Sequence, residues 1–114
     1  MTTSMFIGRY QPFHEGHKKL IDVALEEGNN VVIALRDKYD EDTDPYTAME
    51  RFNFILEQYP EATLYPDTGR ITVCIIPDID EVCYGRKVGW GIRQIHLDKE
   101  TESISATKIR ENMK

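Results

Sequence analysis

Residues 8–17, Gly-Arg-Tyr-Gln-Pro-Phe-His-Glu-Gly-His, join a predicted first strand to a predicted first helix. The strand is the short apolar run 5–8, which ends in glycine. The helix begins at the histidines, because from His14 onward apolar residues recur at the spacing of one helical face. His14 and His17 are three residues apart and therefore share a face of that helix. This stretch predicts the strand–loop–helix unit that opens an α/β sheet.

The start of this helix is predicted to bind an anion. A helix N-terminus offers unpaired N–H groups and a partial positive charge, and two imidazoles add hydrogen-bond donors. Gly16 has no side chain, so a bulky group can approach the backbone there. Arg9 and Lys18 add positive charge nearby. Neither G-x-G-x-x-G nor G-x-x-x-x-G-K-[ST] is present, which argues against an ordinary dinucleotide-binding domain and a P-loop kinase.

The remaining sequence predicts alternating strands and helices. Gly28 suits the end of the first helix, and Thr47 with Glu50 has capping-box spacing for a second helix that ends near Pro60. Further strands are predicted at Val31–Leu35, Ile71–Ile76 and Ile92–Leu97, and a last helix at Ala106–Met113. This order is typical of a parallel α/β sheet with right-handed crossovers. Ligands of such sheets bind at the carboxyl ends of the strands.

The totals limit the function classes. A chain of 114 residues corresponds to one domain, residues 1–114. The net charge of -6 argues against a nucleic-acid-binding surface. No apolar run approaches the roughly 20 residues that span a bilayer, and the N-terminus does not resemble a signal peptide, so we expect a cytoplasmic protein without membrane contact. Cys74 and Cys83 are expected to be free thiols, and their surroundings do not predict zinc.

Three segments resemble the HxGH nucleotidyltransferase superfamily, which is cytidylyltransferase-like. Residues 8–17 are similar to the Gly-Arg-x-Gln-Pro-x-His-x-Gly-His form of archaeal-type nicotinamide mononucleotide adenylyltransferases. Residues 104–110, Ile-Ser-Ala-Thr-Lys-Ile-Arg, resemble the second signature, Ile-Ser-Ser-Thr-x-Ile-Arg. Residues 44–51, Asp-Pro-Tyr-Thr-Ala-Met-Glu-Arg, resemble that family's Asp-Pro-Phe-Thr-Ala-Gly-Glu-Arg. The resemblance implies a Rossmann-like α/β fold with a parallel sheet and flanking helices, reduced in size.

The resemblance also implies a function and its residues. The chain would transfer a nucleoside monophosphate, AMP favoured, from a nucleoside triphosphate to a phosphorylated small-molecule acceptor, releasing pyrophosphate. The catalytic residues would be His14, His17 and Arg110. The residues expected to bind the nucleotide are Gly8, Arg9, Tyr10, Gly16, Lys18, Arg86, Ser105 and Thr107. Mg²⁺ is expected to arrive with the triphosphate, no residue is assigned as a metal ligand, and a homo-oligomer is favoured.

Some of these residues also have simpler interpretations. Arg36 and Asp37 end the second predicted strand and are expected to meet the acceptor, although a surface pair is the alternative. Arg86 lies in a segment rich in glycine and cations that could equally be a turn. Ser105 could serve only as a helix cap. His96 has no chemical neighbours in the sequence and is interpreted as structural.

Two departures from the family pattern keep other functions open. Thr43 stands where the archaeal family has an arginine before Asp-Pro, and the region 78–102 is shorter than the family's, which predicts a missing strand. A cytidylyltransferase that uses CTP and an alcohol phosphate such as glycerol 3-phosphate is one alternative. A non-catalytic nucleotide-binding module is another, and the shortened middle favours it. A nucleotide panel and pyrophosphate release distinguish the three.

Overall fold

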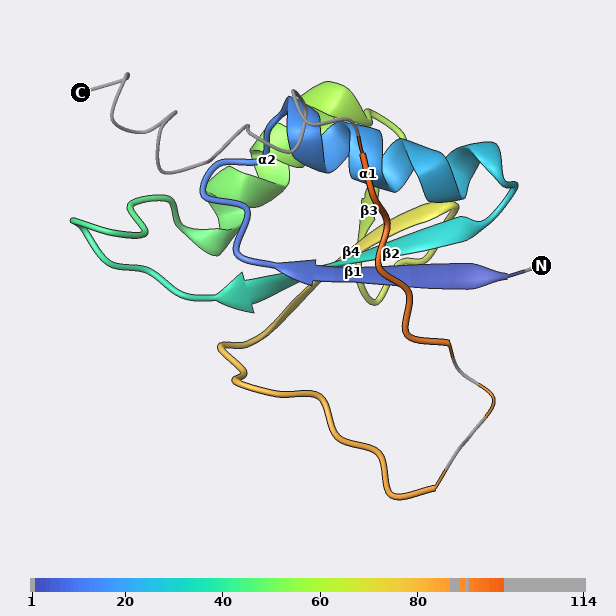
Figure 1. Cartoon of the computed structure of the whole chain (residues 1–114). Coiled ribbons are helices and arrows are strands. Elements are labelled where there is room, and N and C mark those ends of the chain that lie inside the picture. The colour runs from blue at the N-terminus through green and yellow to red at the C-terminus, as the bar shows by residue number, and fades with distance from the viewer. Residues whose placement is uncertain (1, 87–88, 90, 98–114) are drawn as a thin grey trace.

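The computed structural model of the chain describes residues 2–86, 89 and 91–97 (Figure 1). Its elements, in chain order, are β1 (Thr3–Gly8), α1 (Glu15–Glu26), β2 (Asn30–Asp37), α2 (Ala48–Gln58), β3 (Thr63–Leu64) and β4 (Ile71–Pro77). The predicted last helix, Ala106–Met113, lies outside the described residues. No described helix is long and apolar enough to cross a membrane.

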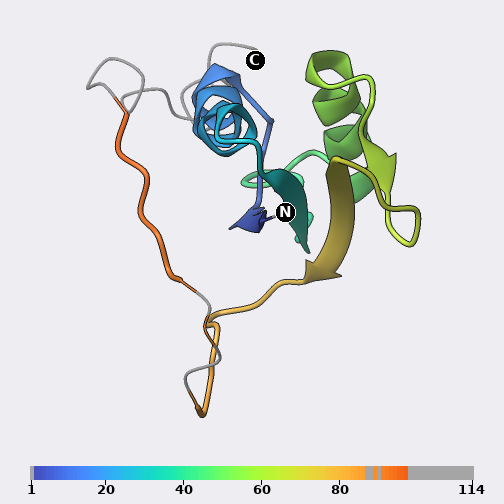
Figure 2. The same ribbon diagram turned by 90° about the vertical axis from the view of Figure 1, so that its right-hand side faces the viewer.

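The strands form one sheet in the order β1-β2-β4-β3, and all neighbours are parallel. In the central register Phe6 lies opposite Ile33, which lies opposite Val73. Both described helices pack on the same face of this sheet (Figures 1 and 2). The predicted α/β fold with a parallel sheet is confirmed. Because β1 and β2 are parallel, the loops that follow them lie at the same edge of the sheet.

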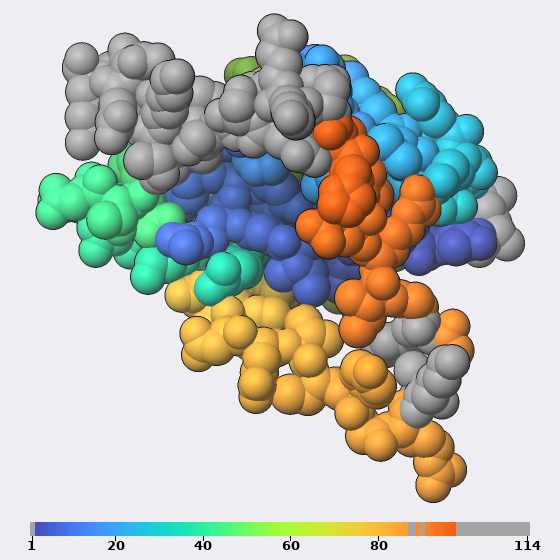
Figure 3. All heavy atoms as spheres, viewed as in Figure 1, coloured from blue at the N-terminus to red at the C-terminus, as the bar shows by residue number. Residues whose placement is uncertain are grey.

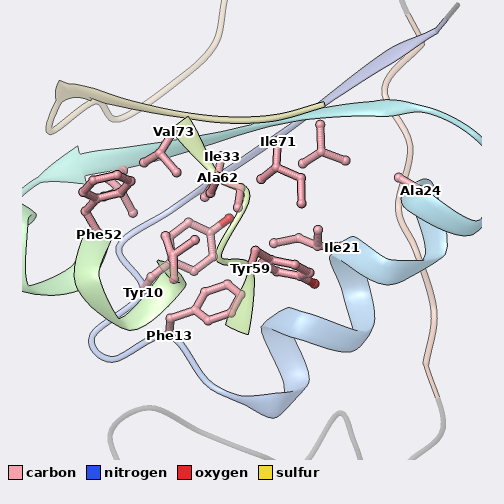
Figure 4. Packing of buried hydrophobic residues seen from close by; sticks show 13 residues of the cluster. Tyr10, Phe13, Ile21, Ala24, Ile33, Phe52, Tyr59, Ala62, Ile71 and Val73 are labelled. Atoms are coloured by element: carbon pink, nitrogen blue, oxygen red, sulfur yellow. The ribbon is translucent and has the colours of Figure 1, made fainter. Parts of the chain in front are cut away.

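The hydrophobic core lies between the sheet and the two helices (Figure 4). Apolar side chains at helical spacing supply one side of it and buried strand residues the other. The fully buried members include Ile21 and Ala24 from α1, Ile55 from α2, and Ile33, Leu35 and Val73 from the sheet. Tyr10 and Phe13 from the loop after β1 also belong to this core. The loop that carries the signature is therefore anchored by its own aromatic residues.

Local sequence signals explain the helix ends. Thr47 Oγ1 accepts from the Glu50 backbone N–H while the Glu50 side chain accepts from the Thr47 N–H, so the predicted capping box is confirmed. Gly28 follows α1 with a φ of 86°, a left-handed conformation that favours glycine. Arg70 donates to the Leu25 carbonyl near the end of α1. Strand β3 was not predicted, because two residues carry no periodic pattern.

The predicted strand Ile92–Leu97 is wrong. Residues 91–97 have no regular secondary structure, and the side chain of Ile92 is 85% exposed. They lie against α1, where Arg93 forms a two-bond ion pair with Glu27 (Figure 3). A parallel strand beside β1 needs a crossover of a dozen or more residues, usually a helix. The described residues of the segment 78–91 contain no helix. No helical crossover therefore brings residues 92–97 beside β1.

Candidate active site

The N-terminus of α1 is built around its two histidines. His14 is the N-cap, and its Nδ1 accepts from the backbone N–H groups of Gly16 at 3.1 Å and His17 at 3.4 Å. In return, the Nδ1 of His17 accepts from the His14 backbone N–H at 3.1 Å. This is a capping box in which imidazoles replace the usual hydroxyl and carboxylate. The predicted pair is thus brought together by the helix end itself.

These hydrogen bonds fix the tautomer of both rings. A neutral imidazole has one donor nitrogen and one acceptor nitrogen. Because both Nδ1 atoms accept, each neutral ring carries its proton on Nε2. The rings stack with centroids 3.6 Å apart and planes 18° apart. Within the described residues neither Nε2–H has a hydrogen-bond partner, so the arrangement offers two adjacent donors to a bound anion.

Burial keeps the two imidazoles neutral. It lowers the pKa of His17 from 6.5 to about 3, with the neighbouring His14 as the second cause. Burial also lowers the pKa of His14, while a backbone hydrogen bond acts in the opposite direction. Two stacked imidazolium ions would repel one another. At neutral pH the pair therefore presents N–H donors and carries no positive charge.

Acidification is expected to destabilise the fold through His17. In the unfolded chain this imidazole takes up a proton near pH 6.5, but in the folded chain only near pH 3. Between these values the unfolded state binds more protons, so the free energy of unfolding falls as the pH is lowered, by up to about 1.4 kcal/mol per pH unit. Above this window the group contributes no pH dependence.

Urea unfolding of the wild type and of His17→Asn, at several pH values between about 4.5 and 7.5, measures this contribution. The difference in stability between the two proteins is expected to shrink as the pH falls, because only the wild type loses the His17 contribution. A constant difference across the window would contradict the buried neutral imidazole. So would an NMR titration that gives His17 an ordinary pKa.

Aromatic residues of the signature support His17. The Tyr10 ring meets the His17 ring edge-on with centroids 4.7 Å apart, and Phe13 stacks on it at 5.5 Å. Tyr10 has a φ of 51°, which turns the loop after Gly8. A Cβ at Gly8 would come within 3.1 Å of the Tyr10 ring, so glycine permits this close approach. Tyr10 and Gly8 were both expected at the nucleotide; in the structure Tyr10 packs against His17, and Gly8 lies against the Tyr10 ring.

Arg9, the first residue after β1, forms an ion pair with an acidic residue. Its Nη1 lies 3.2 Å from Oδ1 of Asp44, which is 1% exposed, while the Arg9 side chain is about half exposed. Thr43, in the position of the family's arginine, donates from Oγ1 to Oδ2 of Asp44. Arg9 thus keeps a partly solvent-exposed guanidinium in the loop that precedes α1, and Thr43 donates to the carboxylate that orients it.

Lys18 points along α1 and not toward its N-terminus. Its Nζ forms an ion pair with Asp22 at 2.9 Å and lies 5.4 Å from the centre of the Tyr59 ring. The Tyr59 hydroxyl donates to the same carboxylate at 2.6 Å. Burial and the Asp22 hydrogen bond raise the pKa of Tyr59. This network joins α1 to the end of α2 and supports the helix that carries the histidines.

Arg36 and Asp37 end β2 at the same edge of the sheet. The Nη2 of Arg36 contacts Asp78 Oδ1 at 2.7 Å and donates to the Ile79 carbonyl, while its Nε is buried without a described partner. Arg36 and Ile7 line a shallow pocket of about 310 Å³, together with residues 79–82. Asp37 is exposed. An acceptor at this edge would meet a guanidinium that already has one carboxylate partner.

The structure does not bring every predicted residue to the histidines. Arg86 is exposed, and residues 78–86 project from the body on the side of the sheet opposite α1 and α2 (Figures 1 and 3). His96, which was interpreted as structural and not assigned to the site, is exposed. Three predicted residues of the second signature lie outside the described part of the chain: Ser105, Thr107 and Arg110.

Two buried polar residues were missed by the sequence interpretation. Gln11 is 2% exposed; it donates to the carbonyls of Lys38 and Tyr46 and accepts from the Tyr46 N–H. Arg51 is fully buried and donates to four backbone carbonyls. Both lie inside the quoted motifs. For Gln11 the available signal was a polar residue between Tyr10 and Phe13, which pack in the core. For Arg51, which follows the exposed Met49 and Glu50, no local signal was available.

A family model described as cytidylyltransferase-like matches residues 5–59, from β1 to the residue after α2. The chain is also 40% identical over 140 aligned positions to the nicotinamide/nicotinic acid mononucleotide adenylyltransferase of Acinetobacter baylyi, with 94% of this chain and 72% of that protein covered. The chain belongs to the cytidylyltransferase-like family. The predicted HxGH superfamily is thereby confirmed.

Other relatives in this family are nicotinamide-nucleotide adenylyltransferases from archaea. The chain is 43% identical to that of Methanosarcina barkeri over 53 residues, which cover 45% of this chain and 31% of the relative. It is 32% identical to that of Saccharolobus solfataricus over 81 residues, which cover 69% and 46%. The chain therefore spans less than half of the length of these two relatives. No solved structure matches it.

The alignment with the Acinetobacter protein also shows a difference in length. It runs over 140 positions, more than the 114 residues of this chain. That relative therefore carries internal residues that this chain lacks. This finding agrees with the expectation that the cytidylyltransferase-like domain is reduced here.

Proposed function

We propose that this chain transfers AMP from ATP to the phosphate of a small-molecule acceptor and releases pyrophosphate. The observation that carries the proposal is the pair of Nε2–H donors at the N-terminus of α1. The names of the cytidylyltransferase-like relatives favour adenylyl transfer over cytidylyl transfer. His14, His17, Arg9 and Gly16 would contact the triphosphate, and Arg110 with Ser105 and Thr107 would complete the site.

The reaction would be one in-line displacement. An oxygen of the acceptor's phosphate forms a bond to the α-phosphorus of ATP, and the bond from that phosphorus to the β-phosphate oxygen breaks. Pyrophosphate leaves with the electron pair of that bond, so no protein nucleophile is required. The residues of the chain would act by positioning and by donating hydrogen bonds to oxygens that gain negative charge. Neutral Nε2–H groups suit this role, because they need not exchange a proton.

Mg²⁺ would be carried mainly by the triphosphate. Among the described residues no group of three or more acidic, histidine or cysteine side chains gathers to hold a metal ion. Mg²⁺ in nucleotide enzymes is often bound by substrate phosphates with few protein ligands. Bound in this way, Mg²⁺ would neutralise part of the phosphate charge. The hydrogen-bond donors of the chain would then orient the triphosphate.

Nicotinamide mononucleotide is the first acceptor to test, because the relatives carry its name. Arg36, at the end of β2, is the cation proposed to meet the acceptor's phosphate, although Asp80 and Glu81 line the same pocket. Since the chain lacks residues that its Acinetobacter relative contains, the acceptor panel should also include nicotinic acid mononucleotide and glycerol 3-phosphate. Arg36 and Asp37 are the residues proposed to meet it.

The decisive experiment measures pyrophosphate release with ATP or CTP, Mg²⁺ and each acceptor in turn. We expect release with ATP and an acceptor, and little release with CTP. Release with CTP and glycerol 3-phosphate alone would make the chain a cytidylyltransferase. Calorimetric binding of ATP without release in any combination would make it a nucleotide-binding module, the second candidate, which the shortened middle region favours. Absence of both binding and release would reject both functions.

A further inference from the structure

Arg51 is a fully buried cation whose hydrogen bonds in the described structure all go to backbone carbonyls. It lies in the first turn of α2, and it is the largest fully buried side chain among the described residues. Its Nη1 donates to the carbonyls of Arg9 and Arg36, both at 2.7 Å. Its Nη2 donates to the Lys38 carbonyl at 3.3 Å, and its Nε to the Thr47 carbonyl at 3.2 Å.

These carbonyls belong to three segments that meet at the carboxyl edge of the sheet. Arg9 follows β1 directly, Arg36 and Lys38 lie at the end of β2, and Thr47 is the N-cap of α2. A buried guanidinium usually pairs with a carboxylate. Here the carboxylates of Asp37 and Asp44 raise the pKa of Arg51 without a hydrogen bond to it, while burial, the larger effect, lowers it.

Gln11, in the loop after β1, bonds to the same two segments, the end of β2 and the start of α2. Its Nε2 donates to the Lys38 carbonyl at 3.0 Å, so this one oxygen accepts from both Gln11 and Arg51. Gln11 also exchanges two hydrogen bonds with the backbone of Tyr46, just before α2. The loop after β1, the end of β2 and the start of α2 are thus joined through two buried side chains.

We propose that Arg51 is a positioning residue that fixes the segment after β1, which carries the phosphate-binding groups, relative to the end of β2, where the acceptor would bind. The inference deepens the proposed function and rests on it for its catalytic consequence. Arginine suits the task because its planar fork reaches several carbonyls at once. Lysine keeps the charge but presents a single ammonium on a flexible stem.

The geometry predicts a separation between binding and turnover. The histidine pair is held by hydrogen bonds at the N-terminus of α1, none of which involves Arg51, and the Arg9 guanidinium is held by its ion pair with Asp44. Nucleotide affinity should therefore survive the loss of the arginine fork. Turnover requires the donor and the acceptor to be aligned, and a displacement of about 1 Å can cost about 10²-fold in rate.

The test compares Arg51→Lys with the wild type and with Arg70→Lys. Arg70 also donates to a backbone carbonyl, that of Leu25, but it is exposed and lies at the far end of α1. For Arg51→Lys we expect ATP affinity within about 3-fold of wild type and turnover lowered about 10²-fold. Amide hydrogen exchange should accelerate at residues 9–11 and 36–38 but not in the first turns of α1. Arg70→Lys should change none of these quantities.

Several outcomes overturn the proposal. They are an unfolded Arg51→Lys chain, unchanged exchange at residues 9–11 and 36–38, wild-type turnover, or a loss of ATP affinity equal to the loss of turnover. Each would show that Arg51 either has only a structural role or does not affect the site. If the wild type itself releases no pyrophosphate, the proposed function fails. The exchange measurement then still decides whether Arg51 fixes the two segments.

Discussion

Replacing His17 by alanine is expected to lower the rate of pyrophosphate release by at least about 10²-fold, the cost of one lost preorganised donor. The substitution removes one of the two stacked Nε2–H groups and also the Nδ1 atom that accepts from the His14 backbone N–H. His14 would lose its ring partner and part of the capping box. The effect should appear mainly in kcat, because a donor aimed at developing charge contributes most in the transition state.

Two further variants separate chemistry from helix capping. In His17→Asn the amide oxygen can still accept from the His14 N–H, so the cap is kept while the imidazole Nε2–H is lost. We expect turnover nearly as low as in His17→Ala, with stability at neutral pH closer to wild type. His96→Ala removes an exposed histidine and should leave turnover unchanged. Wild-type turnover in His17→Ala would remove His17 from the reaction.

Replacing Ile33 by alanine is expected to cost about 2–5 kcal/mol of folding free energy, the range for a large aliphatic residue truncated in a core. Ile33 is fully buried in β2 and lies between Phe6 of β1 and Val73 of β4 in the sheet register. The helices pack over this position (Figure 4). Because β2 links both neighbouring strands, a cavity there leaves few side chains able to relax into it.

The matched control is the same substitution at an exposed position. Ile92 is 85% exposed, so Ile92→Ala should change the free energy of unfolding by less than about 0.5 kcal/mol. Urea unfolding followed by circular dichroism measures both values. Equal effects at the two positions would show that β2 does not form the centre of the sheet.

The elements that sequence periodicity predicts correctly are those whose burial repeats along the chain. Helix α1 shows its apolar face in the sequence, and β2 shows a continuous buried run. Residues 92–97 also contain apolar side chains, but a strand forms only where another backbone can pair with it. That condition is tertiary, and the described part of the connection after β4 does not satisfy it. The two-residue β3 is defined by its pairing with β4, which no local pattern in the sequence predicts.

The same distinction applies to the site. His14 and His17 are brought together by a spacing of three residues on a helix, so the sequence predicts their proximity. The role of Arg51 depends on carbonyls from residues 13 to 42 positions away, which no local pattern reveals. Arg86 was assigned from composition, and composition does not say on which side of the sheet a loop lies.

The central claim is that the paired imidazoles hold the phosphates of a nucleotide, and a crystal structure of the chain with bound ATP and Mg²⁺ tests it most directly. The account predicts triphosphate oxygens within about 3 Å, hydrogen-bond distance, of the Nε2 atoms of both His14 and His17. A triphosphate bound elsewhere, with the two rings contacting only protein or solvent, would contradict it.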